Sequence, residues 1–378
     1  MKSLTLISMV LISTLVGAQA AAAQVRERTP RPPRAPQTPS RTPAPLPPGA
    51  EQGSRIEAGR VSLKLERGGK VSVTNNSGPI SITGADVDTV EAVAENYGGN
   101  APVGIRVYQS STRPLISLST STLEGRRFDG EARFNLKVPR YAHIEIVDSR
   151  DGEIDITDVE GTVSIGAGRD SVTALRVGTL NVARLNGDVT AREVKGPFMA
   201  RTLSGNVSAD SVGGRVEVAT AHGEVHIYNA NADVRVNSTS GEIVIDCARG
   251  AVEAVTLSGS ITLAEIGGNV DANTSSGEVV LRGSIRENGR YRLKSLSGEV
   301  RVHVQAQPPG FTATLMTYNG EVETDFRLEI TPPLRGGFPN RRITGVYGGG
   351  GAQLSLDSFN GSVRILRLAQ GSTKQCKQ

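Results

Sequence analysis

The sequence predicts an all-β fold, a parallel β-solenoid in which short strands stack in successive coils. Glycine recurs every nine residues through the middle of the chain, apolar residues follow each glycine in alternation, and the glycines alternate between two local sequences. Aromatic residues make up only 4% of the chain and tryptophan is absent. Thin, layered burial suits this composition better than a large globular core, which normally depends on aromatic side chains.

The glycine ladder is regular from Gly178 to Gly277. Stepping by nine residues meets glycine at eleven of twelve positions, with Ala232 as the exception: Gly178, Gly187, Gly196, Gly205, Gly214, Gly223, Gly241, Gly250, Gly259, Gly268 and Gly277. We expect each of these glycines at a tight corner. A positive φ or the close approach of the next coil would there disfavour a Cβ by about 1–2 kcal/mol.

Apolar side chains occupy the second and fourth positions after all twelve ladder residues, and the positions between them are mostly polar. This period-two alternation predicts short strands with one buried face. The seventh position predicts a third inward ladder, carried by Leu185, Val194, Leu203, Val212, Leu257 and Ile266. We expect a set of hydroxyl side chains to face outward and to hydrogen-bond between coils: Thr202, Thr220, Ser238, Thr256 and Thr274.

The corners are of two kinds that alternate along the chain. Corners such as Ser240-Gly241-Glu242 and Ser276-Gly277-Glu278 recur in steps of eighteen residues, and the corners at Gly214, Gly250 and Gly268 form a second series. Two unlike corners predict coils of about eighteen residues with two short strands each, stacked about 4.8 Å apart. An antiparallel meander or sandwich is the structural alternative.

The domain organisation follows from where this period begins and breaks. Residues 1–23 are interpreted as a signal peptide, and residues 24–53 as a disordered Pro/Arg-rich segment. Residues 54–368 are predicted to form one solenoid domain, with a β-hairpin excursion at 84–150, an inserted loop at 331–351 and a tail at 369–378. We expect the excursion and the loop to cover the open sheet edges, and we expect no transmembrane segment after the signal peptide.

Charge and cysteine content argue against a nucleic-acid-binding protein and against a small protein held together by a disulfide framework. The residues after position 48 have a formal net charge of −1, because the first 48 residues contain six cations and one acid. We therefore expect no nucleic-acid partner. The two cysteines, Cys247 and Cys376, are too few for a disulfide framework. Cys247 lies in a predicted strand and is interpreted as a buried free thiol, with a bond to the tail residue Cys376 as the alternative.

Three different motifs flank the regular part of the repeat: Phe134-Asn135-Leu136-Lys137-Val138-Pro139, Asp151-Gly152-Glu153-Ile154-Asp155-Ile156 and Phe359-Asn360-Gly361-Ser362-Val363. With the Ser-Gly-Glu-Val corners, they resemble a family of exported bacterial adhesin-like β-strand-repeat domains of unknown function, of the head-GIN or auto-transporter-adhesin-like type. The similarity covers residues 54–368. It implies a β-solenoid-like fold and an envelope location, and it transfers no catalytic residues.

A charged ladder is the candidate binding surface. Glu217, Arg235, Glu253 and Asp271 recur every eighteen residues at outward positions, so stacking would place Arg235 about 5 Å from the glutamates on either side. The ladder could bind a glycan or a metal, or it could serve only to reduce charge repulsion between coils. The sequence has no catalytic motif, no cofactor-binding motif and no metal-ligand spacing, so we expect no catalytic residues, cofactor or metal.

These observations predict a non-catalytic, exported binding or scaffolding module at the cell envelope, either periplasmic or on the cell surface. Its partner would be an envelope polysaccharide or an envelope protein. One alternative is a carbohydrate-active β-helix enzyme, a polysaccharide lyase or hydrolase, with its acids in a cleft beside the excursion or the inserted loop. The other alternative is an envelope-stress sensor or regulator.

Overall fold

The computed structural model describes residues 54–97, 99–110, 112–305, 307–330, 341–368 and 376. Within them the strands form two sheets, sheet A with 17 strands and sheet B with 15, and there is no helix. None of these residues therefore belongs to a helix that could cross a membrane. The predicted signal peptide (1–23), the Pro/Arg-rich segment (24–53), residues 331–340 of the inserted loop and all of the tail except Cys376 lie outside the described residues.

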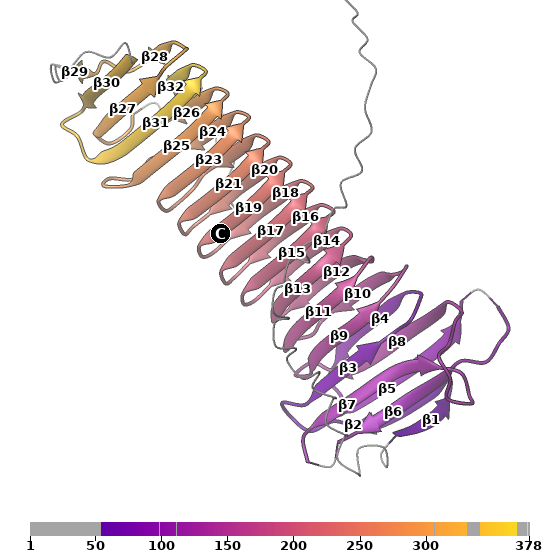
Figure 1. The fold of residues 1–378 in the computed structure, drawn as a ribbon. Helices are drawn as coiled ribbons and strands as arrows, with labels where there is room; N and C mark the ends of the chain where they lie inside the picture. Colours follow the sequence, from indigo (N-terminus) through magenta and orange to yellow (C-terminus); the bar gives the residue numbers. More distant parts are fainter. Residues whose placement is uncertain are drawn as a thin grey trace, which may run out of the picture. The chain divides into compact units, whose positions relative to one another are not determined.

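A regular stack of coils forms the middle of the solenoid (Figure 1), and each coil gives one strand to each sheet. The strands of sheet A are β9 (His143–Ser149), β11 (Thr162–Gly168), β13 (Thr179–Asn186), β15 (Phe198–Ser204), β17 (Val216–His222), β19 (Val234–Ser240), β21 (Val252–Ser258), β23 (Val270–Ser276) and β25 (Arg290–Ser297). Those of sheet B are β10 (Glu153–Thr157), β12 (Ser171–Val177), β14 (Val189–Val194), β16 (Val207–Val212), β18 (Val225–Ala230), β20 (Ile243–Ala248), β22 (Ile261–Ala264), β24 (Val279–Gly283) and β26 (Val300–Val304).

All neighbouring strands of this stack are parallel, and most partners lie one eighteen-residue coil apart. Val216 pairs with Val234 and Val234 with Val252 in sheet A, and Val225 pairs with Ile243 in sheet B. The predicted parallel β-solenoid, with about eighteen residues and two short strands per coil, is confirmed.

The core between the sheets repeats from coil to coil, because each inward residue stacks on its equivalent in the next coil. Val216, Val234, Val225 and Ile243 are all at most 1% exposed. Burying one such side chain contributes about 1.5–3 kcal/mol. A repeat of this kind gains its stability from stacking, since one coil alone cannot cover its own apolar face.

The expected third inward ladder exists at only one of the two corners. Val212 is fully buried, whereas Leu203 and Leu257 are 60% and 58% exposed. In sheet B the residue before Val212, Ser211, has a left-handed backbone (φ 60°), and this shifts the alternation so that Val212 faces inward. In sheet A the alternation continues unbroken to Thr202, so Leu203 faces outward.

The same alternation buries the hydroxyl side chains, so the expectation that they face outward was wrong. Thr202, Thr220, Thr256 and Thr274 are 2–8% exposed. They share the inward face because each stands an even number of residues after the first apolar residue of its strand. One of them does join coils: the hydroxyl of Thr274 donates to the carbonyl oxygen of Gly259 in the preceding coil at 2.9 Å.

Cys247 is bonded to Cys376, with their Cα atoms 5.5 Å apart, so the interpretation of Cys247 as a free thiol was wrong. Cys247 has a left-handed backbone (φ 61°), like Ser211 at the equivalent corner two coils earlier. It is nearly buried but does not belong to the hydrophobic core cluster. The shift in alternation turns its side chain away from the core. On that outer side it forms the bond with Cys376.

At the N-terminal end, antiparallel strands follow the parallel coils. These strands are β1 (Ser54–Ala58), β2 (Arg60–Lys64), β3 (Lys70–Thr74), β4 (Ile80–Ala85), β5 (Thr89–Asn96), β6 (Gly104–Gln109), β7 (Leu115–Ser121) and β8 (Ala132–Pro139). The coil β3/β4 lies between β9/β10 and β7/β8 and is parallel to both. Beyond β7/β8, strands β6 and β5 are antiparallel, and β1 and β2 pair with them at the edge.

At the C-terminal end, the last coil in the sequence is inserted between two earlier ones. The strands are β27 (Phe311–Thr317), β28 (Val322–Thr324), β29 (Glu329–Ile330), β30 (Arg341–Tyr347), β31 (Ala352–Asn360) and β32 (Val363–Arg367). Strands β31/β32 pair with β25/β26 on one side and with β27/β28 on the other. Antiparallel β30 and the two-residue strand β29 then cover the edge of sheet A.

Candidate functional site

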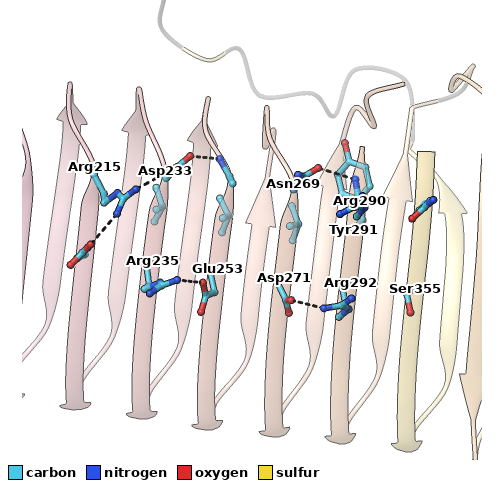
Figure 2. A pocket seen from close by; sticks show the side chains of 16 residues that line it. Arg215, Asp233, Arg235, Glu253, Asn269, Asp271, Arg290, Tyr291, Arg292 and Ser355 are labelled. Atoms are coloured by element: carbon cyan, nitrogen blue, oxygen red, sulfur yellow. Dashed lines mark hydrogen bonds and ion pairs between the residues drawn. The ribbon is translucent and has the colours of Figure 1, made fainter. Parts of the chain in front are cut away.

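A groove of about 450 Å³ runs across the outer face of sheet A, over strands β17 to β25 and β31. Figure 2 shows its side chains projecting from successive parallel strands. Because each strand presents its outward residues at the same register, the groove is lined by columns of side chains that run from coil to coil.

The four residues of the predicted ladder lie in one column of this groove. Glu217 pairs in register with Arg235, Arg235 with Glu253, and Glu253 with Asp271. Arg292 continues the column on β25, although the step from Asp271 is 21 residues instead of eighteen.

Ion pairs connect only some of the neighbouring charges in this column. Arg235 contacts Glu253 at 2.6 Å, and Arg292 contacts Asp271 at 3.1 Å. Glu217 contacts Arg215 at 3.6 Å and forms no ion pair with Arg235 among the described residues. The side chains of Arg235 and Glu253 remain 58% and 45% exposed, so these pairs are accessible to a ligand and contribute little to stability.

A second column, which the sequence analysis missed, lies two residues before the first on each strand. It consists of Arg215, Asp233, Ala251, Asn269, Arg290 and Gln353. The same eighteen-residue step at the position just before each strand could have identified most of it. Arg290 forms no ion pair among the described residues, which leaves its guanidinium available at the β25 end of the groove.

The two columns together contain four arginines and four acids, so the groove is close to neutral. It offers guanidinium, carboxylate and amide groups in rows, with about 4.8 Å between one coil and the next. Such rows can form repeated hydrogen bonds and ion pairs with an extended ligand that carries both donors and acceptors.

A second charged cluster, in a cavity of about 390 Å³, lies at the corner where the strands of sheet B end. We call this the left-handed corner, because residues such as Arg176 and Glu193 have left-handed backbone there. Arg176 holds Asp158 through two contacts of 2.7 and 3.0 Å, and Lys195 contacts Glu160 at 2.9 Å. Hydrogen bonding from Arg176 lowers the pKa of Asp158 to about 2. These groups satisfy one another, which favours a structural role for this cluster.

Three titratable groups away from the groove have pKa values shifted mainly by burial. Burial raises the pKa of Asp170 and of Glu265 and lowers that of His303. They lie on separate coils. Within the part of the chain that the structure describes, no three His, Cys, Asp or Glu side chains gather in a way that could hold a metal ion.

Fold and site together define a class of protein: a parallel β-solenoid whose outward face carries ladders of polar side chains. Residues 133–366 match the family described as Toastrack DUF4097. The match covers more than half of the chain, and the protein belongs to this family.

Two solved structures are similar to this chain. One is described as a "putative cell adhesion protein" from Clostridium sporogenes; identity is 11%, the match covers 82% of this chain and 100% of that chain, and the TM-score is 0.17. The other is a "putative adhesin" from Bacteroides fragilis; identity is 12%, coverage is 82% and 97%, and the TM-score is 0.27. No curated protein matches the sequence.

Proposed function

We propose that the protein is a non-catalytic, exported binding or scaffolding module of the adhesin type, acting at the cell envelope through the groove on sheet A. The observation that supports this proposal is the register of Glu217, Arg235, Glu253 and Asp271, which places charges of both signs in one exposed line across four coils. A rigid line of this kind suits an extended envelope polysaccharide or a strand of an envelope protein.

A charge-swap experiment tests the groove. The double variant Arg235→Glu/Glu253→Arg keeps the ion pair but reverses its direction, so its thermal stability should match that of the wild type. We expect its binding to the cell-envelope fraction of the producing cell, measured by co-sedimentation, to fall at least fivefold. Unchanged binding by this variant would show that the groove is not the binding site. Failure of the wild type to bind any envelope component would remove the proposed function itself.

The enzyme alternative has its own test in the same groove. Glu253 and Asp271 are register partners on neighbouring strands, about 4.8 Å apart along the stack, and retaining glycosidases use two carboxyl groups about 5–5.5 Å apart. Each of the two is already held by an arginine, which fits a binding surface better. Turnover of a glycan by the wild type that is abolished in Glu253→Gln would overturn the non-catalytic proposal.

A further inference from the structure

A narrow apolar ridge runs along one edge of the outer face of sheet A, separate from the groove. It consists of Leu296, Phe359 and Tyr318, which are 55%, 45% and 50% exposed. They occupy equivalent positions on three adjacent coils, just before the corners of β25, β31 and β27. Along a strand the ridge lies four residues from the charged column, about 13 Å away.

The two aromatic rings of the ridge are held in a defined arrangement. The rings of Phe359 and Tyr318 are stacked with their centroids 4.8 Å apart and their planes 3° apart. Parallel backbone pairing continues past the end of β27, because the amide of Asn319 donates to the carbonyl of Phe359 at 2.9 Å. One face of each ring therefore lies against its partner, and the exposed parts of the two side chains, 45% of Phe359 and 50% of Tyr318, remain for other contacts.

Exposed aromatic residues are rare in this chain. It has seven Phe, seven Tyr and no Trp, and the exposed ones among the described residues are Tyr97, Phe359 and Tyr318. The guanidinium of Arg133 covers the ring of Tyr97 at 4.7 Å. Preceding coils have small or aliphatic residues at the ridge position: Leu203, Ala221, Thr239, Leu257 and Ser275. The solenoid therefore does not need aromatic rings at this position.

Hydrogen-bonding groups border the ridge on both sides. On the corner side, the side-chain amide of Asn319 donates to that of Asn360 at 2.8 Å, and both residues are exposed. On the strand side, Lys294 and Asp357 form an ion pair at 3.8 Å. The border therefore offers amide and charged groups with no net charge.

We propose that this ridge is a binding site for an uncharged, extended glycan. A sugar ring has an apolar C–H face that packs against an aromatic or aliphatic strip, and its hydroxyl groups need donors and acceptors beside that strip. The coils are about 4.8 Å apart, which is comparable with the length of one hexose in an extended β-linked chain. Successive sugars could thus meet Leu296, Phe359 and Tyr318 in turn.

A glycan fits the ridge better than a protein partner does. The ridge is one side chain wide and polar groups flank it directly, whereas the aromatic anchors of protein interfaces lie in broad patches from which surrounding contacts exclude water. A structural explanation would be that the ring pair only stabilises the end of the solenoid, with about 0.5–1.5 kcal/mol.

Titration of the full-length protein with cellohexaose and with chitohexaose, followed by calorimetry, tests the site. We expect the wild type to bind at least one of them. Phe359→Leu keeps an apolar side chain like that of Leu296 but removes the ring, and it should weaken binding at least tenfold. Phe359→Tyr keeps the aromatic ring and should bind within twofold of the wild type.

Two further measurements distinguish this site from the groove and from misfolding. The thermal midpoint of Phe359→Leu should stay close to that of the wild type, and if it falls sharply, the exposed pair Asn319→Ala/Asn360→Ala replaces it in the titration. The charge swap at Arg235 and Glu253 should leave oligosaccharide binding unchanged. The site is refuted if the wild type binds neither oligosaccharide, if Phe359→Leu binds as the wild type does, or if the ridge captures only a protein.

Discussion

The two corners of each coil both contain left-handed backbone, yet only one of them requires glycine there. At the glycine corner, six equivalent residues have φ between +119° and +156°: Gly205, Gly223, Gly241, Gly259, Gly277 and Gly298. At the left-handed corner, seven equivalent residues have φ between 50° and 62° and none is glycine: Asp158, Arg176, Glu193, Ser211, Asn229, Cys247 and Glu265.

The corners differ in whether left-handed backbone and close approach of the neighbouring coil fall on the same residue. A Cβ on Gly241 would overlap the carbonyl oxygen of Gly223 in the preceding coil. At the left-handed corner, the side chains of Arg176 and Glu193 are exposed and meet no such obstacle. Gly250, also at the left-handed corner, has an ordinary φ, but a Cβ there would overlap the backbone of Ala232. Stacking distance, more than backbone conformation, therefore decides where this solenoid needs glycine.

The largest effect should come from a side chain at the glycine corner. Gly241→Ala combines a backbone conformation that L residues rarely adopt with an overlap against the preceding coil, and it should lower the free energy of unfolding by about 3 kcal/mol or more. Gly250→Ala introduces only the overlap, and Ala232 already occupies the equivalent place one coil earlier, so we expect a loss of about 1–2 kcal/mol. Urea denaturation measures both, and a larger loss in Gly250→Ala would contradict the comparison.

Loss of the disulfide at the left-handed corner should have the next largest effect. The bond joins residues 129 apart in the sequence, so it restricts the unfolded chain strongly, and its removal should cost about 2–4 kcal/mol. Cys247→Ser/Cys376→Ser should reproduce the stability of the reduced wild type. If the oxidised wild type and the double variant unfold at the same urea concentration, the bond contributes nothing to stability.

The ion pair at the left-handed corner should make stability depend on pH. The pKa of Asp158 is about 2 in the folded protein and about 3.9 in an unfolded chain. Its contribution is therefore complete above about pH 4 and is lost as the pH falls from about 4 to 2. The difference in unfolding free energy between the wild type and Arg176→Gln should shrink over this interval. A difference that stays constant from pH 7 to pH 2 would contradict the assignment.

Relief of left-handed strain should give the smallest effect, and one of opposite sign. Glu193 is exposed with φ 54°. Glu193→Gly removes a strain of about 1–2 kcal/mol and adds a backbone entropy cost of about 0.5–1 kcal/mol, so the protein should gain up to about 1.5 kcal/mol. Glu153→Gly, at an exposed site in β10 without positive φ, should instead lose about 0.5–1 kcal/mol. Equal losses in the two variants would show that the left-handed corner stores no strain.

The repeat itself could be predicted from the sequence because stacking forces equivalent residues onto one spacing. Val216 and Val234 show that spacing directly, and so do Glu217 and Arg235 in the candidate groove. The spacing does not show where the alternation shifts. Leu203 and Val212 occupy the same position after their glycines, yet the left-handed Ser211 turns only Val212 inward.

The ridge could not be predicted from the repeat spacing, because its two rings are 41 residues apart. The coils that carry them also do not stack in the order of the sequence. Phe359 lies on a coil inserted between β25/β26 and β27/β28, which brings it against Tyr318. One signal was present in the sequence: Tyr318-Asn319-Gly320 and Phe359-Asn360-Gly361 share an aromatic–Asn–Gly pattern. A shared corner sequence indicates equivalent positions in two coils, and the pairing of β27 with β31 makes these coils neighbours.

The inserted last coil also sets an order of assembly. A chain made from its N-terminus can stack each coil on the previous one as far as β26, but β27 and β28 have no final neighbour until β31 and β32 have been synthesised. The gap closes only when contacts of long sequence separation form, and such contacts form slowly. The C-terminal end of the solenoid, which holds the ridge, should therefore be the last part to become native.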